Sequence, residues 1–459
     1  MRLVTLTICA VFVIASSAAA EPLRIATFDV DASPPIGSPL AYDPNKEVQI
    51  PLSCRGIVLI GTEEPIVLCA VDWLGIANGA HREFREALAK AVGTKPERVA
   101  VHTLHQHDAP WADFDTDALV TKHNIPYRPF DSKFVRDVIA RAAAAVAKAK
   151  DEARAVTHVG LSAGKVEKVA SNRRVLGPDG KVKIIRWSST KEPAAIAAPE
   201  GTIDPFVKLV VFYNNDKPLA ALTYYATHPQ SYYRTGKANP DFPGIARNLR
   251  QEATGVPHIH FNGAAGNVTA GKYNDGAVEN RQILADRLAQ GMAAAFDDVK
   301  KLPIVASDVK WNTFSAALPP ASHLDEAKLL AVIDDKEKAP LQRFTLANNL
   351  AWLQRCQAQQ NSIALGCLSL GKAKILHMPG ELFVEYQLEA QQLAPENFVA
   401  MAAYGDYGTA YIGTAIAYTQ GGYETGPTAS HVAPEAESAL MNGIAKLLGA
   451  DEARLRPLR

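Results

Sequence analysis

Apolar residues recur along the chain in two rhythms, and their alternation predicts a mixed α/β protein. Short runs rich in β-branched residues are typical of buried strands, whereas apolar residues three and four positions apart are typical of helices. The predicted strands are 24–30, 55–60, 65–71, 99–104, 206–213, 219–227, 363–370 and 374–377. The predicted helices are 80–92, 132–150, 243–253, 281–296, 382–393 and 434–447, with two more within 324–357. Strands alternating with helices favour mixed β-sheets covered by helices.

Composition and charge narrow the class of protein. The 459 residues are 47% hydrophobic, which is ample for a sizeable core. No internal repeat, low-complexity tract or linker is evident, so residues 21–459 are interpreted as one large domain. The 48 basic and 48 acidic residues give no net charge, which argues against nucleic acid as a partner.

The first twenty residues form a predicted signal peptide. Met1-Arg2 is a short basic start, 3–14 is an apolar run, and Ala18 to Ala20 offer small residues for cleavage before Glu21. The apolar run is too short to span a bilayer. Because no later segment has eighteen apolar residues in a row, the mature protein is expected to be secreted or periplasmic, without a transmembrane segment.

Four cysteines follow the signal peptide, and an even number in an exported protein is compatible with two disulfides. The preferred pairing joins near neighbours, Cys54 with Cys69 and Cys356 with Cys367. Free buried thiols are the alternative for either pair. No Cys-x-x-Cys occurs, which argues against a cysteine zinc site or a redox motif.

The richest segment for chemistry is 101–110, where His102, His105 and His107 follow an apolar strand. On an extended backbone His105 and His107 project to the same side, so both can face one site. Neutral imidazole is the commonest zinc ligand. The alternative is a polar loop whose histidines are satisfied by hydrogen bonds.

Three further segments place reactive or permissive residues after apolar stretches. His228-Pro229 closes a strand, and the alternative for His228 is a histidine that caps a turn. The loop 261–269 is rich in small residues, which let backbone amides approach a ligand closely. Glu381 follows a Pro-Gly turn, where most glutamates are simply solvated.

In this order the segments resemble the neutral ceramidase family over nearly the whole mature chain. The matching motifs are Leu104-His105-Gln106-His107-Asp108-Ala109-Pro110, Asn172-Arg173-Arg174, His228-Pro229, Gly266-Asn267-Val268-Thr269 and Pro379-Gly380-Glu381-Leu382. Each motif is weak alone, and five in the same order are fairly specific. The resemblance implies a secreted zinc-dependent amidase with a ceramidase-like catalytic domain, acting on a lipid-like N-acyl amide such as a sphingolipid.

The resemblance also implies roles for single residues. One zinc ion per chain would be bound by His105, His228 and Glu381, with a tyrosine as fourth ligand. His107 would activate the attacking water or protonate the leaving amine, and Arg173 would face the polar head of the substrate. Two imidazoles and a carboxylate leave an open position on zinc, which lowers the pKa of bound water to about 7.

The sequence departs from the family pattern in three places. Thr269 replaces a loop serine, and its hydroxyl is predicted to contact the reaction intermediate or to cap a turn. Thr414 stands where the family's ligand tyrosine belongs, so Tyr411 is the predicted ligand, with Tyr418 and Tyr423 lining the substrate pocket. The family's best-known members also continue into a C-terminal β-sandwich domain, which is not present here. Nearby aromatic residues suit an apolar substrate portion or a packed core, namely Trp111, Tyr232 and Tyr233.

Two other functions fit the same residues. A metal-free hydrolase would use Thr269 as nucleophile with His107 or His228 as its base. A non-catalytic secreted binding protein would keep the fold with a decayed site.

Overall fold

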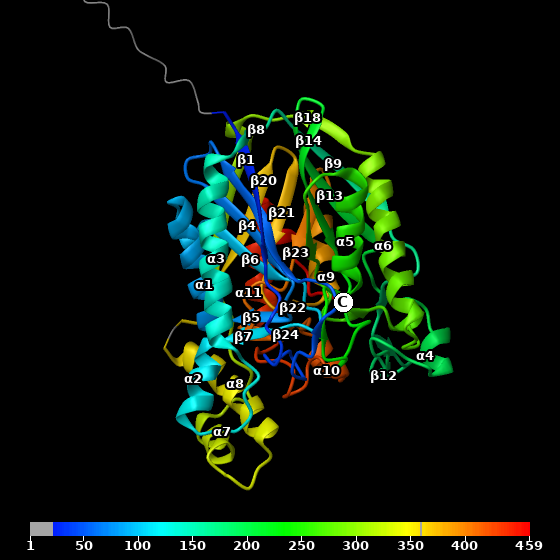
Figure 1. Cartoon of the computed structure of the whole chain (residues 1–459). Coiled ribbons are helices and arrows are strands. Elements are labelled where there is room, and N and C mark those ends of the chain that lie inside the picture. Colours follow the sequence, from blue (N-terminus) through cyan, green and yellow to red (C-terminus); the bar gives the residue numbers. More distant parts are fainter. Residues whose placement is uncertain (1–21, 359) are drawn as a thin grey trace, which may run out of the picture.

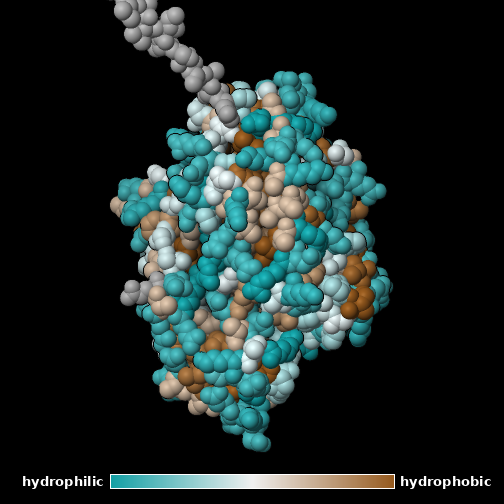
Figure 2. Space-filling model, turned by 60° about the vertical axis from the view of Figure 1, so that its left-hand side comes forward, coloured by the Kyte–Doolittle hydropathy of each residue, from teal (hydrophilic) through white to brown (hydrophobic). Residues whose placement is uncertain are grey.

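The computed structural model describes residues 22–358 and 360–459, and it confirms the predicted mixed α/β class (Figure 1). The predicted signal peptide lies outside these residues. Within them no helix is both long and apolar enough to cross a membrane. Hydrophilic side chains cover most of the face in Figure 2, and apolar side chains form small separate areas.

Three sheets share one strand order, in which the first three strands are antiparallel neighbours and the fourth lies parallel to the third. In the first sheet these strands are β1 (Arg24–Asp31), β3 (Ser53–Ile60), β4 (Ile66–Val71) and β6 (Val99–Thr103). In the second they are β9 (His158–Lys165), β13 (Phe206–Asn214), β14 (Lys217–Tyr225) and β16 (His258–Asn262). In the third they are β19 (Val309–Ala317), β20 (Ser362–Leu370), β21 (Ala373–His377) and β23 (Phe398–Ala402).

Two helices complete each set of four strands. The first crosses over between the parallel strands: α1 (Asn78–Val92), α5 (Asp241–Thr254) or α9 (Val384–Leu393). The second follows the fourth strand and packs against the first: α3 (Ser132–Asp151), α6 (Glu279–Asp297) or α11 (Ala436–Leu448). The chain is therefore a threefold structural repeat over 24–151, 158–297 and 309–448. The sequence interpretation that found no repeat is corrected by this topology.

The remaining elements are short or lie between the repeated ones. The small strands are β2 (Glu47–Val48), β5 (Gly75–Ala77), β7 (Trp111–Asp113), β8 (Arg154–Ala155), β10 (Ser171–Asn172), β11 (Arg174–Leu176), β12 (Val182–Ile185), β15 (Lys237–Ala238), β17 (Val268–Thr269), β18 (Lys300–Pro303), β22 (Glu381–Leu382) and β24 (Tyr411–Ile412). The other α-helices are α2 (Phe114–Lys122), α4 (Pro193–Ala197), α7 (Glu326–Ile333), α8 (Pro340–Gln357) and α10 (Ala417–Gln420). Helices α7 and α8 are the two predicted within 324–357.

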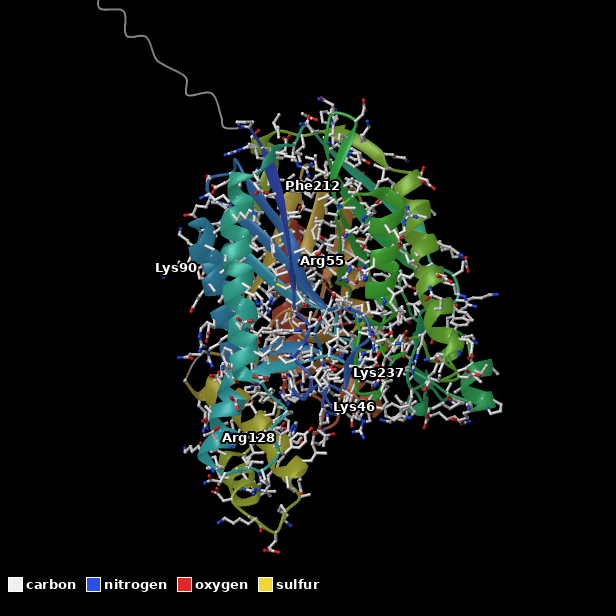
Figure 3. All side chains as sticks on the ribbon, in the orientation of Figure 1. Lys46, Arg55, Lys90, Arg128, Phe212 and Lys237 are labelled. Atoms are coloured by element: carbon white, nitrogen blue, oxygen red, sulfur yellow. The ribbon has the colours of Figure 1, made fainter. Side chains whose placement is uncertain are left out.

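Alternating side chains divide the core into layers. In β3, Val58 packs in a core with helices α1 and α3, whereas Ile57 packs in a core shared by all three sheets. In β13, Val211 packs in a core with helices α5 and α6, whereas Phe212 packs in the core shared by all three sheets. Figure 3 shows Phe212 between the strands and Lys90 pointing outward from α1. Helices therefore cover the outer faces of the sheets, and the inner faces bury one another.

The strand order brings three chain segments of each repeat to the same edge of its sheet. Parallel third and fourth strands end on the same side, because a helix returns the chain to its starting side. The first strand runs in the same direction as the third, so the connection from first to second strand emerges there too. Residues after the third and fourth strands therefore meet the insertions between the first and second strands.

Two backbone hydrogen bonds and one side-chain hydrogen bond join the three repeats where their fourth strands end. The Thr103 N–H donates to the Tyr404 carbonyl at 3.0 Å, and the Ala403 N–H donates to the Asn262 carbonyl at 2.9 Å. The Asn262 side chain donates from Nδ2 to the Leu104 carbonyl at 3.3 Å. We call these three bonds the junction triangle, since each joins two different repeats.

All four cysteines are free among the described residues, so the predicted disulfides are not formed. Cys54 and Cys69 do lie on adjacent strands, with their sulfur atoms 3.5 Å apart and buried. Sequence proximity therefore predicted the neighbourhood of this pair but not its bonding.

Replacement of Asn262 by leucine should destabilise the fold by removing one side of the junction triangle. The amide also accepts from the Thr227 N–H at 3.3 Å, so Asn262→Leu leaves two buried groups without partners. A loss of about 2–6 kcal/mol in the free energy of unfolding is expected, at about 1–3 kcal/mol for each of the two unsatisfied groups. Chemical denaturation measures it. Asn397→Leu, which removes one exposed hydrogen bond, is the control, and equal losses in both variants would contradict the role of the junction triangle.

Buried histidines should make the fold acid-sensitive. Burial lowers the pKa to about 4 or about 3 at His81, His102, His258, His260 and His431. Since the unfolded value is about 6.5, the unfolded chain binds more protons as the pH falls from 6.5 toward 4, and the free energy of unfolding decreases. Burial raises the pKa of Asp113 and Asp241 to about 6. These two carboxyls bind protons in the folded state below pH 6 and so increase the free energy of unfolding there. We expect the five histidines to outweigh them.

Denaturation of the chelator-treated protein at pH 7.5 and pH 5 tests this balance without a contribution from bound metal. A lower free energy of unfolding at pH 5 is expected. An equal or higher value there would show that the buried histidines do not control acid stability.

Candidate metal centre

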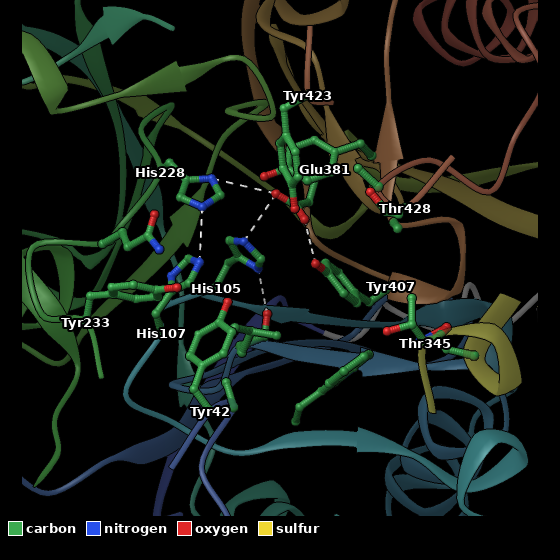
Figure 4. Close-up of a pocket in the computed structure, with 18 of the residues that line it drawn as sticks. Tyr42, His105, His107, His228, Tyr233, Thr345, Glu381, Tyr407, Tyr423 and Thr428 are labelled. Carbon is green, nitrogen blue, oxygen red and sulfur yellow. Dashed lines mark hydrogen bonds and ion pairs between the residues drawn. The ribbon is translucent and has the colours of Figure 1, made fainter. Parts of the chain in front are cut away.

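His105, His228 and Glu381 meet at the edge where the three sheets converge, one from each repeat (Figure 4). His105 follows β6, His228 follows β14 and Glu381 follows β21. Each is at most 2% exposed. The three side chains predicted from separate motifs are therefore brought together, and His107 stands beside them.

His105 is held by backbone carbonyls in a strained conformation. Its φ is +66°, which is uncommon for a residue with a side chain. Its N–H donates to the Trp73 carbonyl at 2.9 Å, and its ring packs on Tyr404 with centroids 4.6 Å apart. Nδ1 lies 2.8 Å from the Leu74 carbonyl. Because a carbonyl only accepts, Nδ1 carries the proton and Nε2 carries a lone pair.

The same reasoning fixes the protons of the other two imidazoles. His107 Nδ1 lies 3.2 Å from the Pro229 carbonyl, so it donates and leaves a lone pair on Nε2. His228 Nε2 lies 3.3 Å from that Nε2 and must therefore donate to it. The lone pair of His228 is then on Nδ1.

The lone pairs of His105 and His228 point at the same carboxylate oxygen. Glu381 Oε2 lies 3.2 Å from His105 Nε2 and 3.6 Å from His228 Nδ1. All three atoms are buried and have no hydrogen-bond partner among the described residues. Three acceptors facing one another in a buried site repel unless a cation lies between them. His105, His107 and His228 also form a group compact enough to hold a metal ion.

Glu381 and Tyr411 are neighbours on paired strands. Strands β22 and β24 run parallel with Glu381 opposite Tyr411, and the Glu381 N–H donates to the Ala410 carbonyl at 2.9 Å. The second carboxylate oxygen of Glu381 accepts from the Tyr407 hydroxyl at 2.5 Å. Arg173 donates from Nη1 to the Tyr411 hydroxyl oxygen at 3.0 Å. Burial and the Glu381 carboxylate raise the pKa of Tyr411 well above its usual range, and the Arg173 guanidinium opposes this shift in part.

Burial and neighbouring charges set the ionisation of these groups. Burial lowers the pKa of His107 and of His228 well below its usual range, and His105 adds to both shifts. Both imidazoles therefore stay neutral at pH 7, as metal ligation requires. Although burial opposes it, Tyr411 and Glu424 raise the pKa of Arg173, so this arginine stays charged. Glu424 lies 3.8 Å from Arg173 and is itself fully buried.

A cavity of about 590 Å³ opens above these residues, within the range of about 300–1,000 Å³ typical of ligand sites. The insertion between the first and second strands of each repeat forms part of its wall. These insertions contribute Ala41 and Tyr42 from the first repeat, Arg173, Trp187, Ser188 and Ser189 from the second, and Leu341, Phe344, Thr345, Asn348 and Asn349 from the third. Tyr423, which the sequence placed at the pocket, also lines the cavity, as do Trp111 and Tyr233, for which a packed core was the alternative.

Three predicted residues do not line the cavity. The Tyr418 hydroxyl is bonded to Ser430 Oγ at 2.9 Å and to the Val432 carbonyl at 3.2 Å. Tyr232 packs under Arg281. Thr269 is buried beside His228, and its hydroxyl has no partner among the described residues. The predicted catalytic role of Thr269 therefore remains a prediction.

Several important contacts were not predicted from the sequence. Tyr407 binds Glu381, Glu424 faces Arg173, and the Leu74 carbonyl orients His105. Tyr407 does carry the kind of sequence signal that marks the other site residues, because it lies in the loop that follows the apolar strand β23. A backbone carbonyl such as that of Leu74 has no residue-type signal.

Two solved structures that share this fold are ceramidases. The neutral ceramidase from Pseudomonas aeruginosa is 15% identical, with a TM-score of 0.69 over 95% of this chain and 75% of that chain. A ceramidase complexed with C2 is also 15% identical, with a TM-score of 0.68 over 95% and 76% of the two chains. Protein-family models and curated protein sequences give no match. The resemblance expected from the motifs is thus confirmed as a shared fold.

Proposed function

We propose that this chain is a zinc-dependent hydrolase that cleaves N-acyl amide bonds. The observation that carries the proposal is the convergence of three buried, unpartnered acceptors, His105 Nε2, His228 Nδ1 and Glu381 Oε2, at the floor of a cavity. The shared fold supports the type of reaction, because the similar structures are ceramidases, which cleave an N-acyl amide.

The proposed zinc ligands are His105, His228, Glu381 and Tyr411. Nitrogen and oxygen donors of these types suit zinc, and Tyr411 is aligned with Glu381 on the neighbouring strand. His107 belongs to the same compact histidine group, but the lone pair of its Nε2 accepts from His228. We therefore place His107 beside the metal and not among its ligands.

A zinc ion held there would act as a Lewis acid that polarises the substrate carbonyl and lowers the pKa of water. In the proposed reaction neutral His107 accepts a proton from the attacking water and returns it to the leaving amine. Its 3.3 Å contact with His228 is long enough to be exchanged for a contact with water. Arg173 holds Tyr411 and faces the polar head of the substrate, while Tyr423 lines the pocket.

The threonine-nucleophile alternative has less support. A threonine nucleophile needs a base within hydrogen-bond reach, and the Thr269 hydroxyl has no such partner in the described part of the chain. A non-catalytic binding protein would hold no metal in a decayed site, and one that kept the metal would still not hydrolyse N-acyl amides. Metal analysis and the hydrolysis assay together therefore separate the proposed function from both alternatives.

The purified mature protein should retain about one zinc ion per chain after dialysis against metal-free buffer, because the three buried acceptors need a cation between them. His105→Ala should lose this zinc, and hydrolysis of N-acyl amides should fall more than about a hundredfold, beyond the effect typical of an indirect contact. Elemental analysis and fatty-acid release measure the two effects.

His123→Ala is the matched control, because His123 pairs with Asp334 near the surface and lies outside the cavity. Zinc content and hydrolysis in that variant should equal those of the parent. Unchanged zinc and activity in His105→Ala would refute the metal site.

Tyr407→Phe should weaken zinc binding without unfolding the protein. The hydroxyl of Tyr407 orients Glu381 through its second oxygen, and removing such a contact typically costs about 10–100-fold in metal affinity. Competition with a chromophoric chelator gives the affinity. An affinity equal to that of the parent would show that Glu381 is not a ligand or does not need this contact.

A further inference from the structure

Arg234 is a cation at the cavity wall without an acidic partner. Its guanidinium lies 5.0 Å from the ring centroid of Tyr42 and 5.6 Å from that of Tyr233. Both rings in turn flank His107, with centroids 6.0 and 6.1 Å away (Figure 4). No carboxylate in the described ranges lies within 4.0 Å of this guanidinium. The rings of Tyr42 and Tyr233 therefore lie between Arg234 and His107, which stands beside the candidate metal centre.

The loop that carries Arg234 is fixed from both sides by buried carboxylates. Asp241 accepts from the Ser231 N–H at 3.0 Å, and Asp108 accepts from the Thr235 N–H at 3.1 Å. Both carboxylates are at most 2% exposed. Between these anchors Arg234 has a φ of +54°, a strained conformation that persists only where the surroundings enforce it. The position of this cation is therefore built into the loop.

The cavity has few charged side chains. Only Arg173, Arg234 and Glu381 are charged side chains among the described lining residues. Arg173 contacts Glu424, and Glu381 faces the two imidazoles. Asp43 and Arg234 both act on Tyr127, because burial and Asp43 raise the pKa of Tyr127 while Arg234 opposes the shift. Asp43 does not line the cavity, so a ligand there meets the charge of Arg234 uncompensated.

Another part of the cavity wall is apolar. Trp111 and Phe344 pack edge to face with centroids 5.7 Å apart, and Leu341 continues this wall toward solvent with 54% of its surface exposed. An acyl chain is the natural occupant of such a wall, which leaves the amine side of an N-acyl substrate for the polar region near Arg234.

We propose that the substrates are N-acyl amides whose amine component carries a carboxylate, such as N-acylated acidic amino acids or peptides, and that Arg234 binds this carboxylate. The inference rests on the proposed amide hydrolysis and narrows its substrate class. A guanidinium fixed by aromatic rings can bind a carboxylate with two parallel hydrogen bonds. A neutral N-acyl amide has no group that uses this charge.

The test compares two substrates that differ by one charge, the α-amides of N-decanoylglutamate and N-decanoylglutamine. The ratio of their kcat/KM values for decanoate release should favour the glutamate compound. Arg234→Gln should lower this ratio roughly 1.5- to fivefold, the range for one exposed charge pair, whereas Arg234→Lys should retain most of it. The preference should also shrink as salt is raised, because an exposed charge is screened.

Lys237→Gln is the matched control, because Lys237 lies three residues away, is exposed and pairs with Glu47 at 2.7 Å. A ratio that is unchanged in Arg234→Gln, or equally lowered in Lys237→Gln, would overturn the inference. If neither compound nor ceramide is cleaved, the proposed function fails. Trp187 fluorescence titrations of the parent and Arg234→Gln with the same two compounds then decide the role of Arg234, and equal affinities would overturn it.

Discussion

The junction triangle is the constraint on which fold and site both depend. Its three hydrogen bonds join Thr103 to Tyr404, Ala403 to Asn262, and Asn262 to Leu104. Each bond joins two repeats, so no sheet can shift against the others without leaving a buried amide or carbonyl unpaired. His105 follows Leu104 directly and packs on Tyr404. The same bonds that hold the sheets together therefore fix one of the candidate metal ligands.

Most helices and many strands were predictable because their apolar periodicity is strong, as in α3 and β4. Strands β9, β16, β19 and β23 were not predicted. In β16 two histidines and an asparagine interrupt the apolar pattern, and their burial depends on partners such as Thr223 and Leu104 in distant segments. The threefold repeat was also missed. Its three copies share a topology but not residues, and many apolar sequences satisfy one strand order if volume and pattern are kept.

The candidate ligands could be predicted because each lies just beyond a recognisable strand, which parallel pairing brings to a common edge. What the motifs did not show is the proton arrangement. Backbone carbonyls at Leu74 and Pro229 fix the protons of His105 and His107, and any residue type supplies a carbonyl. The motifs also predicted Tyr418 at the pocket, but its hydroxyl is hydrogen-bonded to nearby Ser430 instead. Side-chain direction in a loop depends on such competing contacts and not on sequence spacing.

The junction triangle and the insertions that line the cavity belong to different chain segments, and this separation has an evolutionary consequence. Part of the cavity wall comes from the connections between first and second strands, which contribute no residue to the junction triangle, and other loops supply Tyr233, Arg234 and Tyr423. Surface connections can lengthen or change at little thermodynamic cost. The cavity wall can therefore change while the floor that carries His105, His228 and Glu381 stays in place, and the fold itself tolerates divergence to 15% identity.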